Sequence, residues 1–278
     1  MPELPEVETM RRGVLEIVGR RIRDVRQPRC ELKPIKITPR FSDFRRRAVG
    51  RKIVAVERLG KRVVVELDSG DRIIFEPRMT GRLLLVNPPD TKHLRLIFDL
   101  SGRPARKLLF WNLRGLGVVH LMSPRRFAQQ FSPDKTGPDA LAISTELLSE
   151  RLGRSARAIK VALLDQRAVA GIGNIYASEI LHRIGVHPEL PCNKLRPAQW
   201  KKLHAAIVQV LDEAILHQGS TLSDGNYRNA QNEPGGFQDH HRVYQRTDEK
   251  CPTCRRGTIA RIVQAQRSTF FCPRCQRM

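Results

Sequence analysis

The sequence predicts an α+β fold with more than one domain, on three observations. Short β-rich runs fill residues 20–122, helical patterns follow from about residue 147, and two Cys-x2-Cys pairs lie near residue 278. A length of 278 residues fits roughly two domains. The content of 40% hydrophobic and 28% charged residues is typical of a folded chain rather than a disordered one.

The charge balance indicates a polyanionic partner. The chain has 50 Lys and Arg against 28 Asp and Glu, a formal net charge of +22. Such an excess is typical of nucleic-acid binding, although charge alone does not exclude an enzyme of acidic metabolites. The longest apolar runs fall short of the ~18 residues of a membrane span, and the acidic opening does not resemble a secretory signal. We therefore expect no membrane partner.

Residues 5–18 are expected to form the first helix. Pro5 suits the first helical position, and Gly19 suits the stop. Five apolar residues recur at helical spacing on one face: Val7, Met10, Val14, Ile17 and Val18. Seven short β-rich runs then follow, at 52–57, 62–66, 72–76, 82–86, 94–98, 107–111 and 117–120. Many short strands favour a sandwich or a barrel, so residues 1–130 form the first predicted domain.

The second half is predicted to be helical. Residues 131–146 contain turn and breaker residues and are the expected linker. A helical domain over 147–240 is expected to contain about four helices, around 147–148, 159–163, 175–184 and 200–216. Residues 219–241 have little periodicity and are predicted to be a long loop. Long loops in compact domains are often functional.

Four cysteines predict a zinc site in the last domain, residues 241–278. Seventeen residues separate the Cys251/Cys254 pair from the Cys272/Cys275 pair. This spacing is typical of a tetrahedral four-cysteine site, and four protein ligands leave no open position for catalysis. We expect one structural Zn²⁺ per chain, on a hairpin with strands at 258–264 and 267–271. The alternative is two redox dithiols.

The opening Met1-Pro2 suggests a nucleophile. A small second residue usually permits removal of the initiator Met, which leaves Pro2 as a secondary amine. The following helix N-terminus disfavours a positive charge and is expected to lower the pKa of that amine. A neutral amine can form a Schiff base, and Glu3 could move protons beside it. Many proteins nevertheless begin Met-Pro with no such chemistry.

Three blocks carry a resemblance to a known family. Residues 2–9 (PELPEVET), residues 171–179 (GIGNIYASE) and the finger block 265–272 (AQRSTFFC) resemble the bacterial formamidopyrimidine-DNA glycosylases in order and spacing. The resemblance covers nearly the whole chain. It implies an N-terminal β-sandwich with a catalytic N-terminal helix, a helix–two-turn–helix domain and a four-cysteine zinc-finger β-hairpin. It also implies a monomer in the bacterial cytoplasm, associated with the nucleoid.

The resemblance implies a bifunctional DNA glycosylase and abasic-site lyase of base excision repair. Its substrates would be 8-oxoguanine and formamidopyrimidines in damaged duplex DNA. Pro2 would form the Schiff base and Glu3 would move protons. Lys61 would lie near the lesion, and Arg267 would reach the phosphates beside it. The bland alternatives are a solvated lysine at a strand start and a surface arginine.

Further residues are implied to bind DNA. Met79, Arg114 and Leu116 would fill the space left by the extruded nucleotide, with Leu116 where the family normally has phenylalanine. Three more are implied near the phosphates or the lesion: Lys160, Asn174 and Tyr227, the last flanked by Asn226 and Arg228. The alternatives are a core or turn methionine at 79, a strand residue at 116, an exposed helix lysine at 160 and a helix N-cap at Asn174.

Two departures from the family pattern concern DNA contacts. Glu76 stands where the family has histidine, and a carboxylate facing phosphates would repel DNA unless Arg78 or Arg82 compensates. Gly115 stands where the family has a second arginine. Both bear on affinity, opposite-base preference and lesion range. The rival functions are an oxidised-pyrimidine glycosylase of the endonuclease VIII type and a non-catalytic zinc-finger binder of damaged DNA.

Overall fold

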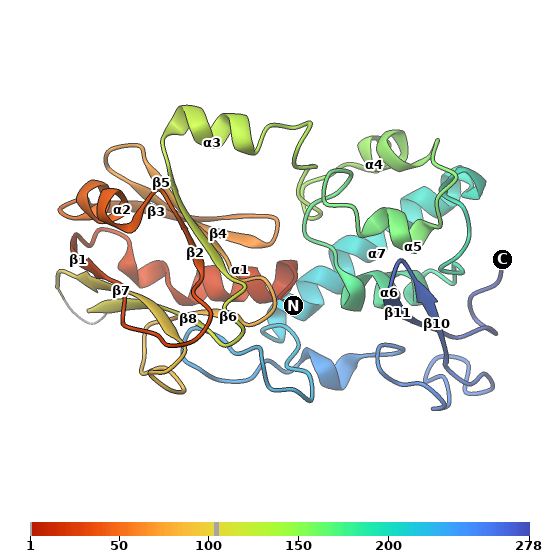
Figure 1. Cartoon of the computed structure of the whole chain (residues 1–278). Coiled ribbons are helices and arrows are strands. Elements are labelled where there is room, and N and C mark those ends of the chain that lie inside the picture. The colour runs from red at the N-terminus through yellow and green to blue at the C-terminus, as the bar shows by residue number, and fades with distance from the viewer. Residues whose placement is uncertain (1, 103–105) are drawn as a thin grey trace. The chain divides into compact units, whose positions relative to one another are not determined.

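A computed structural model describes residues 2–102 and 106–278 (Figure 1). These residues form two compact units. Unit 1 contains the chain up to residue 132 together with residues 215–238, and unit 2 contains residues 133–214 and 239–278. The predicted boundaries at residues 130, 146 and 240 stay a prediction, because packing units need not coincide with domains. Residues 215–238 nevertheless pack in unit 1, whereas the prediction grouped them with the helices.

Unit 1 contains two β-sheets (Figure 1). The four-stranded antiparallel sheet has the order β1 (Ile22–Arg26), β7 (Leu94–Leu100), β8 (Lys107–Asn112) and β6 (Gly81–Leu84). The five-stranded sheet has the order β2 (Lys36–Thr38), β9 (Val118–Met122), β5 (Arg72–Glu76), β4 (Arg62–Leu67) and β3 (Ile53–Leu59). Its β2–β9 pair is parallel and its other pairs are antiparallel. All seven predicted strands are present, with small shifts at their ends.

The core of unit 1 lies between these sheets. The Phe75 ring, from β5, lies 5.7 Å from that of Phe98 on β7 and 5.6 Å from that of Phe110 on β8. Edge-on and tilted rings at this distance add to the apolar burial that holds the sheets together. The β-sandwich is therefore confirmed, and the barrel alternative is wrong.

Helix α1 (Leu4–Gly13) packs against β3 and β4 of one sheet and β6 of the other. Val7, Met10, Val14 and Ile17 are fully buried, as predicted. Val18 is 40% exposed, so its place on the buried face is wrong. The α-helix ends at Gly13, and a 3-10 turn over Leu15–Ile17 changes the phase of the side chains.

Two helices of unit 1 have no apolar stripe in the sequence. Helix α2 (Phe41–Ala48) buries only Phe44 and Ala48, one turn apart, beneath three consecutive arginines. Helix α3 (Pro124–Gln130) has no fully buried residue and begins with Ser123 as N-cap and Pro124 in the first turn. Helix α3 is therefore defined by its N-terminal cap, whereas α2 has no side-chain cap and is held by its few buried residues.

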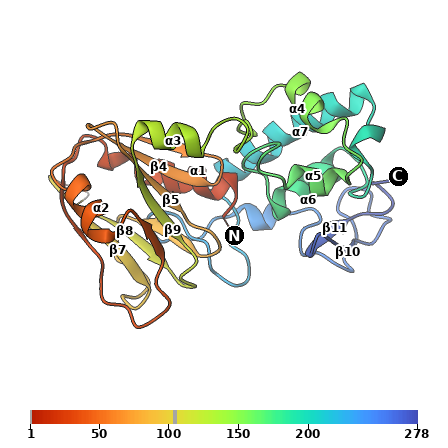
Figure 2. The same ribbon diagram turned by 45° about the horizontal axis from the view of Figure 1, so that its top comes forward.

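Unit 2 contains four α-helices and the hairpin (Figure 2). The helices are α4 (Thr145–Leu152), α5 (Ile159–Leu163), α6 (Asn174–Arg183) and α7 (Pro197–Leu216), whose last two residues belong to unit 1. The hairpin pairs β10 (Ala260–Gln264) with β11 (Arg267–Phe271), and β11 packs on α6. Ala265 and Gln266 both have positive φ, as a tight hairpin turn requires. Within the described residues, none of the helices has the length and apolar character needed to cross a bilayer.

Candidate active site and DNA-binding residues

Pro2 and Glu3 lie buried at the beginning of α1. Glu3 is the N-cap residue, and its backbone N–H donates to Glu6 Oε2 at 2.8 Å. The other oxygen of that carboxylate accepts the Ser220 backbone N–H, also at 2.8 Å. Both carboxylate oxygens of Glu6 are thus used within unit 1. They hold the predicted catalytic pair, Pro2 and Glu3, to residues 217–238 with charge-assisted hydrogen bonds.

A second carboxylate of α1 holds the turn that carries Lys61. Glu8 accepts hydrogen bonds from Arg11, Arg12 and Arg58 at 2.8–3.1 Å. Arg58 also donates to the Gly60 carbonyl at 3.2 Å. Burial raises the pKa of Glu8, but the hydrogen bonds and charges of these arginines outweigh it and bring that pKa to about 2. Glu8 is therefore ionised at neutral pH. Lys61 lies half-buried in the turn, directly after Gly60.

The three predicted void-filling residues lie on two neighbouring turns of unit 1. Met79 is 41% exposed, and Arg114 Nη1 lies 3.2 Å from its sulfur. Leu116 is half-buried, and its N–H donates to Asn112 Oδ1 at 3.1 Å. The Asn112 amide in turn donates to the Pro77 carbonyl. Buried Asn112 thus ties both turns together, which brings all three residues to one region.

The two departures have local explanations. Gly115 has φ 61°, and a Cβ there would lie 2.3 Å from the Lys33 carbonyl oxygen, so the loop excludes an arginine. Arg82 does not compensate for Glu76, because it is buried and donates to Gly225, Asn226 and Asn232. Burial lowers the pKa of Arg82 to about 10. Glu76 instead pairs with Arg62 and Arg78.

Tyr227 belongs to the core of unit 1. Its hydroxyl donates to the Gln218 carbonyl at 2.9 Å and lies 3.4 Å from the Glu6 carbonyl. Burial and the Glu6 charge raise its pKa well above 10. Within the same segment, Thr221 Oγ1 donates to the Tyr227 carbonyl. A lesion contact by Tyr227 itself stays a prediction.

In unit 2, Lys160 and Asn174 hold the hairpin. The Lys160 ammonium is buried and donates to Asn174 Oδ1 at 2.6 Å and to Thr269 Oγ1 at 2.7 Å. The Asn174 amide donates to the Ser268 carbonyl at 2.9 Å. The exposed-lysine alternative is therefore wrong. The N-cap alternative is also wrong, because Gly173 is the N-cap of α6. Arg267 lies exposed next to the hairpin turn.

The four paired cysteines fit one zinc ion. All four sulfurs lie within 4.8 Å of one another, and Cys251–Cys275 and Cys254–Cys272 are each 3.8 Å apart. Tetrahedral zinc with Zn–S bonds of about 2.3 Å places neighbouring sulfurs about 3.8 Å apart. Backbone N–H groups of Arg256 and Gly257 lower the pKa of Cys254 to about 6, whereas burial raises that of Cys272 and Cys275. A divalent cation lets such crowded thiols all ionise.

Helix α6 carries two buried groups that anchor this finger. Glu179 accepts the backbone N–H groups of residues 242–244 at 2.8–3.0 Å. His182 Nε2 lies 3.5 Å from Cys251 Sγ. Burial and the charge of Arg242 lower the pKa of His182 to about 4, so the ring is neutral at pH 7. A neutral ring can donate its Nε2–H to the thiolate, which orients this ligand.

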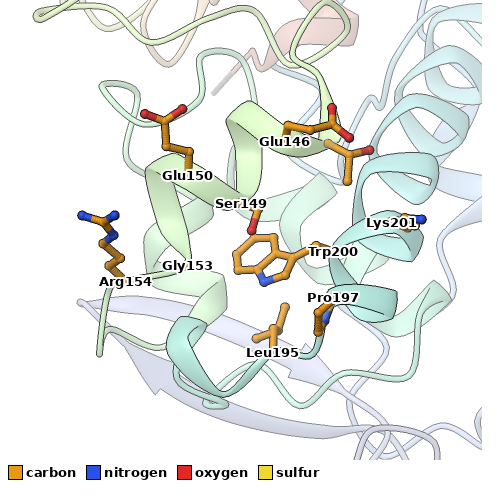
Figure 3. Close-up of a pocket in the computed structure, with 10 residues that line it drawn as sticks. Glu146, Ser149, Glu150, Gly153, Arg154, Leu195, Pro197, Trp200 and Lys201 are labelled. Atoms are coloured by element: carbon orange, nitrogen blue, oxygen red, sulfur yellow. The ribbon is translucent and has the colours of Figure 1, made fainter.

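A cavity of about 500 Å³ in unit 2 is not lined by any predicted site residue. It lies between α4 and the beginning of α7, with Trp200 between Ser149 and Leu195 (Figure 3). Its rim carries both signs of charge, from Glu146, Glu150, Arg154 and Lys201. It therefore does not present the uniform positive field that DNA phosphates favour.

Comparisons with known proteins agree with this geometry. The family models described as Formamidopyrimidine-DNA glycosylase N-terminal domain, Formamidopyrimidine-DNA glycosylase H2TH domain and zinc finger found in FPG and IleRS match residues 1–119, 136–225 and 248–277. The Formamidopyrimidine-DNA glycosylase of Chloroflexus aurantiacus is 40% identical, over 99% of this chain and 98% of that protein. This chain belongs to the formamidopyrimidine-DNA glycosylase family.

Other family members show the same full-length match. The Bacillus subtilis Formamidopyrimidine-DNA glycosylase is 39% identical over 99% of both chains. A Lactococcus lactis FPG mutant, solved with Fapy-dG containing DNA, has a TM-score of 0.87 and 33% identity over 100% of both chains. The MutM (FPG) protein of Thermus thermophilus has a TM-score of 0.85 and 36% identity, over 99% of this chain and 98% of that one.

Sequence reasoning did not find the residues that hold the site. Glu6 and Glu8 lie where acidic residues are common in the first turn of a helix, and the sequence shows no partner for Asn112 or Glu179. Their partners lie far along the chain, as in the pair of Glu6 and Ser220. The available signal was the placement of acidic residues on an otherwise apolar helix face, where a buried charge requires a partner.

Proposed function

We propose that this chain is a bifunctional DNA glycosylase and abasic-site lyase of base excision repair. Its substrates are oxidised or ring-opened purines, 8-oxoguanine and formamidopyrimidines, in duplex DNA. The observation that carries the proposal is the Pro2–Glu3 pair, which the Glu6 carboxylate holds at the beginning of α1. Its support is the full-length match to proteins named Formamidopyrimidine-DNA glycosylase.

Removal of Met1 leaves Pro2 with a secondary amine. The nitrogen lone pair attacks C1′ of the damaged nucleotide, and the bond from C1′ to the base breaks. The base leaves with the bonding pair and takes up a proton. Glu3 accepts the N–H proton of the attached amine and delivers it to the sugar ring oxygen, so that the nitrogen lone pair opens the ring to an iminium ion.

The iminium is an electron sink that acidifies the neighbouring sugar protons. Loss of a C2′ proton expels the 3′ phosphate, with cleavage of the C3′–O bond. Loss of the C4′ proton then expels the 5′ phosphate, with cleavage of the C5′–O bond. Hydrolysis of the remaining imine releases Pro2. One nucleophile thus supports both the glycosylase and the lyase steps.

The other site residues bind and position DNA. Lys61 and Arg267 contact phosphates beside the lesion, and Asn174 contributes from the beginning of α6. Met79, Arg114 and Leu116 fill the space left in the duplex when the nucleotide is extruded. Lys160 acts from beneath the hairpin, through its hydrogen bonds to Asn174 and Thr269.

Zinc positions the hairpin and takes no part in the reaction. When bound, the ion crosslinks both Cys-x2-Cys turns and supplies no open coordination site. Cys251, Cys254, Cys272 and Cys275 hold it at the base of β10 and β11. The hairpin can then present Arg267 at its tip with little loss of conformational entropy on binding.

The proposed lesion class is supported by solved relatives bound to damaged DNA. Solved Lactococcus lactis structures contain Fapy-dG containing DNA and abasic site containing DNA. We expect faster excision of 8-oxoguanine than of thymine glycol from otherwise identical duplexes. The opposite order would favour an oxidised-pyrimidine glycosylase. We further propose that the chain acts as a monomer in the cytoplasm, where it associates with the nucleoid.

Borohydride trapping tests the mechanism. Hydride reduces the iminium to a stable amine, so wild-type protein and lesion DNA should give one covalent complex. Intact-mass measurement should find the protein without Met1. The combined Pro2→Gly and Glu3→Gln variant should trap almost no DNA. Absence of a wild-type complex contradicts the mechanism and favours a non-catalytic binder. Equal trapping by the variant contradicts the roles of Pro2 and Glu3 and places the Schiff base on another amine.

A further inference from the structure

Arg78 has a backbone conformation that glycine adopts more easily. Its φ is 55°, in the left-handed region where a side chain is strained. The residue lies on the β5–β6 turn, directly before Met79. The strain alone does not assign a role to Arg78, so the contacts of its side chain carry the argument.

A buried carboxylate holds this side chain. Glu76 Oε2 lies 2.8 Å from Arg78 Nη2, and Glu76 Oε1 accepts the Arg62 Nε–H at 2.9 Å. The Glu76 side chain is only 10% exposed, whereas those of Arg62 and Arg78 are 26% and 54% exposed. Two guanidinium groups thus share one carboxylate, which leaves a net charge of +1 on the outer side.

The cluster links two turns that carry predicted DNA-binding residues. Arg62 directly follows Lys61 on one turn, and Arg78 directly precedes Met79 on the other. Arg114 also contacts the Met79 sulfur. The exposed guanidinium of Arg78 therefore belongs to a positive surface around an exposed methionine. This surface lies entirely within unit 1.

We propose that Arg78 binds a phosphate of duplex DNA beside the lesion, with Glu76 and Arg62 as positioning residues. This inference rests on the proposed function. The carboxylate at position 76 does not face the phosphates as an unpaired charge, because both of its oxygens bind arginine. It holds a planar guanidinium that matches a phosphate better than a single point charge does.

Salt-dependent binding tests the inference. The probe is a duplex with a tetrahydrofuran abasic-site analogue, which the enzyme cannot cleave, and anisotropy gives the Kd across a NaCl series. Arg78→Gly removes one charge and the backbone strain. We expect its Kd to rise roughly tenfold, and the slope of log K against log [salt] to fall in magnitude by about 0.9. Its melting temperature should stay equal or rise.

Three further variants separate the effect of position from that of charge. Arg255 is a second exposed arginine with positive φ, 53°, and Arg255→Gly should leave the salt slope unchanged. Arg78→Lys should keep the slope and lose part of the affinity. Glu76→Gln removes a negative charge but also the hold on Arg78. We therefore expect weaker binding, whereas a merely repulsive carboxylate predicts tighter binding.

The outcomes are distinguishable. A wild-type chain that does not bind the duplex contradicts the proposed function and this inference with it. Wild-type binding combined with an unchanged slope in Arg78→Gly overturns this inference alone. This inference is also overturned if the salt slope falls as much in Arg255→Gly as in Arg78→Gly. It is overturned as well if Glu76→Gln binds the duplex more tightly than the wild type does.

Discussion

At the scale of single residues, the acids of α1 hold the site together. Glu6 bridges the Glu3 and Ser220 backbones, and Glu8 bridges the helix to Arg58. Each carboxylate is buried and fully hydrogen-bonded, which offsets the cost of removing its charge from water. In a chain of net charge +22, these acids are structural counterions rather than surface charges.

Glu8 predicts a specific acid sensitivity. Its pKa in the folded protein is about 2, below the ordinary value of 4.5. The stabilisation is therefore fully present above about pH 4.5 and is lost as the pH falls toward 2, on the order of 3 kcal/mol. Glu8→Gln should lower the free energy of unfolding at pH 7 and flatten its fall between these values, as measured by urea denaturation.

The matched control for this measurement is Glu16→Gln. Glu16 is exposed in the 3-10 turn that follows the same helix. The Glu16→Gln variant should lose stability between pH 4.5 and 2 as steeply as the wild type does. An acid limb in Glu8→Gln that is as steep as in the wild type would contradict the role given to the Glu8–arginine cluster.

At the scale of elements, the segment 217–238 is held by close backbone approach. Gly219 has φ 78°, and a Cβ there would lie 2.8 Å from Glu6 Oε1. Gly235 packs against the Gly219 carbonyl in the same way, since its Cβ would lie 2.3 Å from that oxygen. This segment has neither helical nor strand periodicity. Close backbone contacts at its glycines hold it instead.

Gly219→Ala is therefore expected to loosen this segment. The new methyl group adds steric overlap with Glu6 to the strain of a positive φ, with an expected loss of about 2 kcal/mol. Hydrogen exchange of the Ser220 amide should become faster, because its bond to Glu6 is disturbed. Gly225→Ala is the control: it has φ 61° but open space around the Cβ. Equal exchange rates in both variants would exclude the contact with Glu6 as the cause.

The zinc finger gives a second prediction at this scale. Cys254→Ser removes one of four ligands, so the finger should lose zinc. Without zinc, the hairpin should become disordered. We expect DNA affinity to fall roughly tenfold or more through Arg267, while the sandwich unfolds as in the wild type. Zinc content, binding anisotropy and thermal unfolding report these three effects.

Cys30→Ser is the matched control for this variant. Cys30 lies outside the sulfur cluster and contacts Arg95 in unit 1. It should retain both zinc and DNA affinity. If Cys254→Ser loses zinc but binds DNA as tightly as the wild type, the hairpin does not position Arg267 as proposed.

At the scale of the whole molecule, the charge provides attachment and the site provides chemistry. A net charge of +22 favours any DNA through release of counterions. The proposed reaction itself uses an uncharged amine and one carboxylate. Arg58 and Arg62 are committed to internal ion pairs, and Arg82 is committed to internal hydrogen bonds. Net charge thus overstates the number of phosphate contacts.

We expect binding to depend steeply on salt. With 6–10 phosphate contacts, affinity should fall roughly 10³–10⁵-fold between 50 and 200 mM salt. Arg267→Ala should reduce the slope by about 0.9, whereas Lys201→Gln, at the rim of the unit 2 cavity, should leave it unchanged. Binding of the tetrahydrofuran duplex that barely responds to salt would contradict a phosphate-based interface.

Prediction from the sequence succeeded where periodicity or spacing is local. The strand 72–76 has its predicted bounds, and the cysteine spacing identified a cluster with the dimensions of a zinc site. Prediction from the sequence failed for segments in which only a few side chains are buried. Helix α2 buries only two residues beneath a run of arginines, and Val18 left the buried face because a 3-10 turn changed the phase.

The sequence by itself determined seven strands of the sandwich, the main helices, the four zinc ligands and the family. These follow from period-two and helical patterns and from short motifs, which need no distant partner. Only the tertiary structure decided that Glu6 holds Ser220, that Asn112 joins two turns and that Glu76 holds Arg78 outward. The stability of a buried charge or amide depends on the group opposite it, and folding alone brings these groups together.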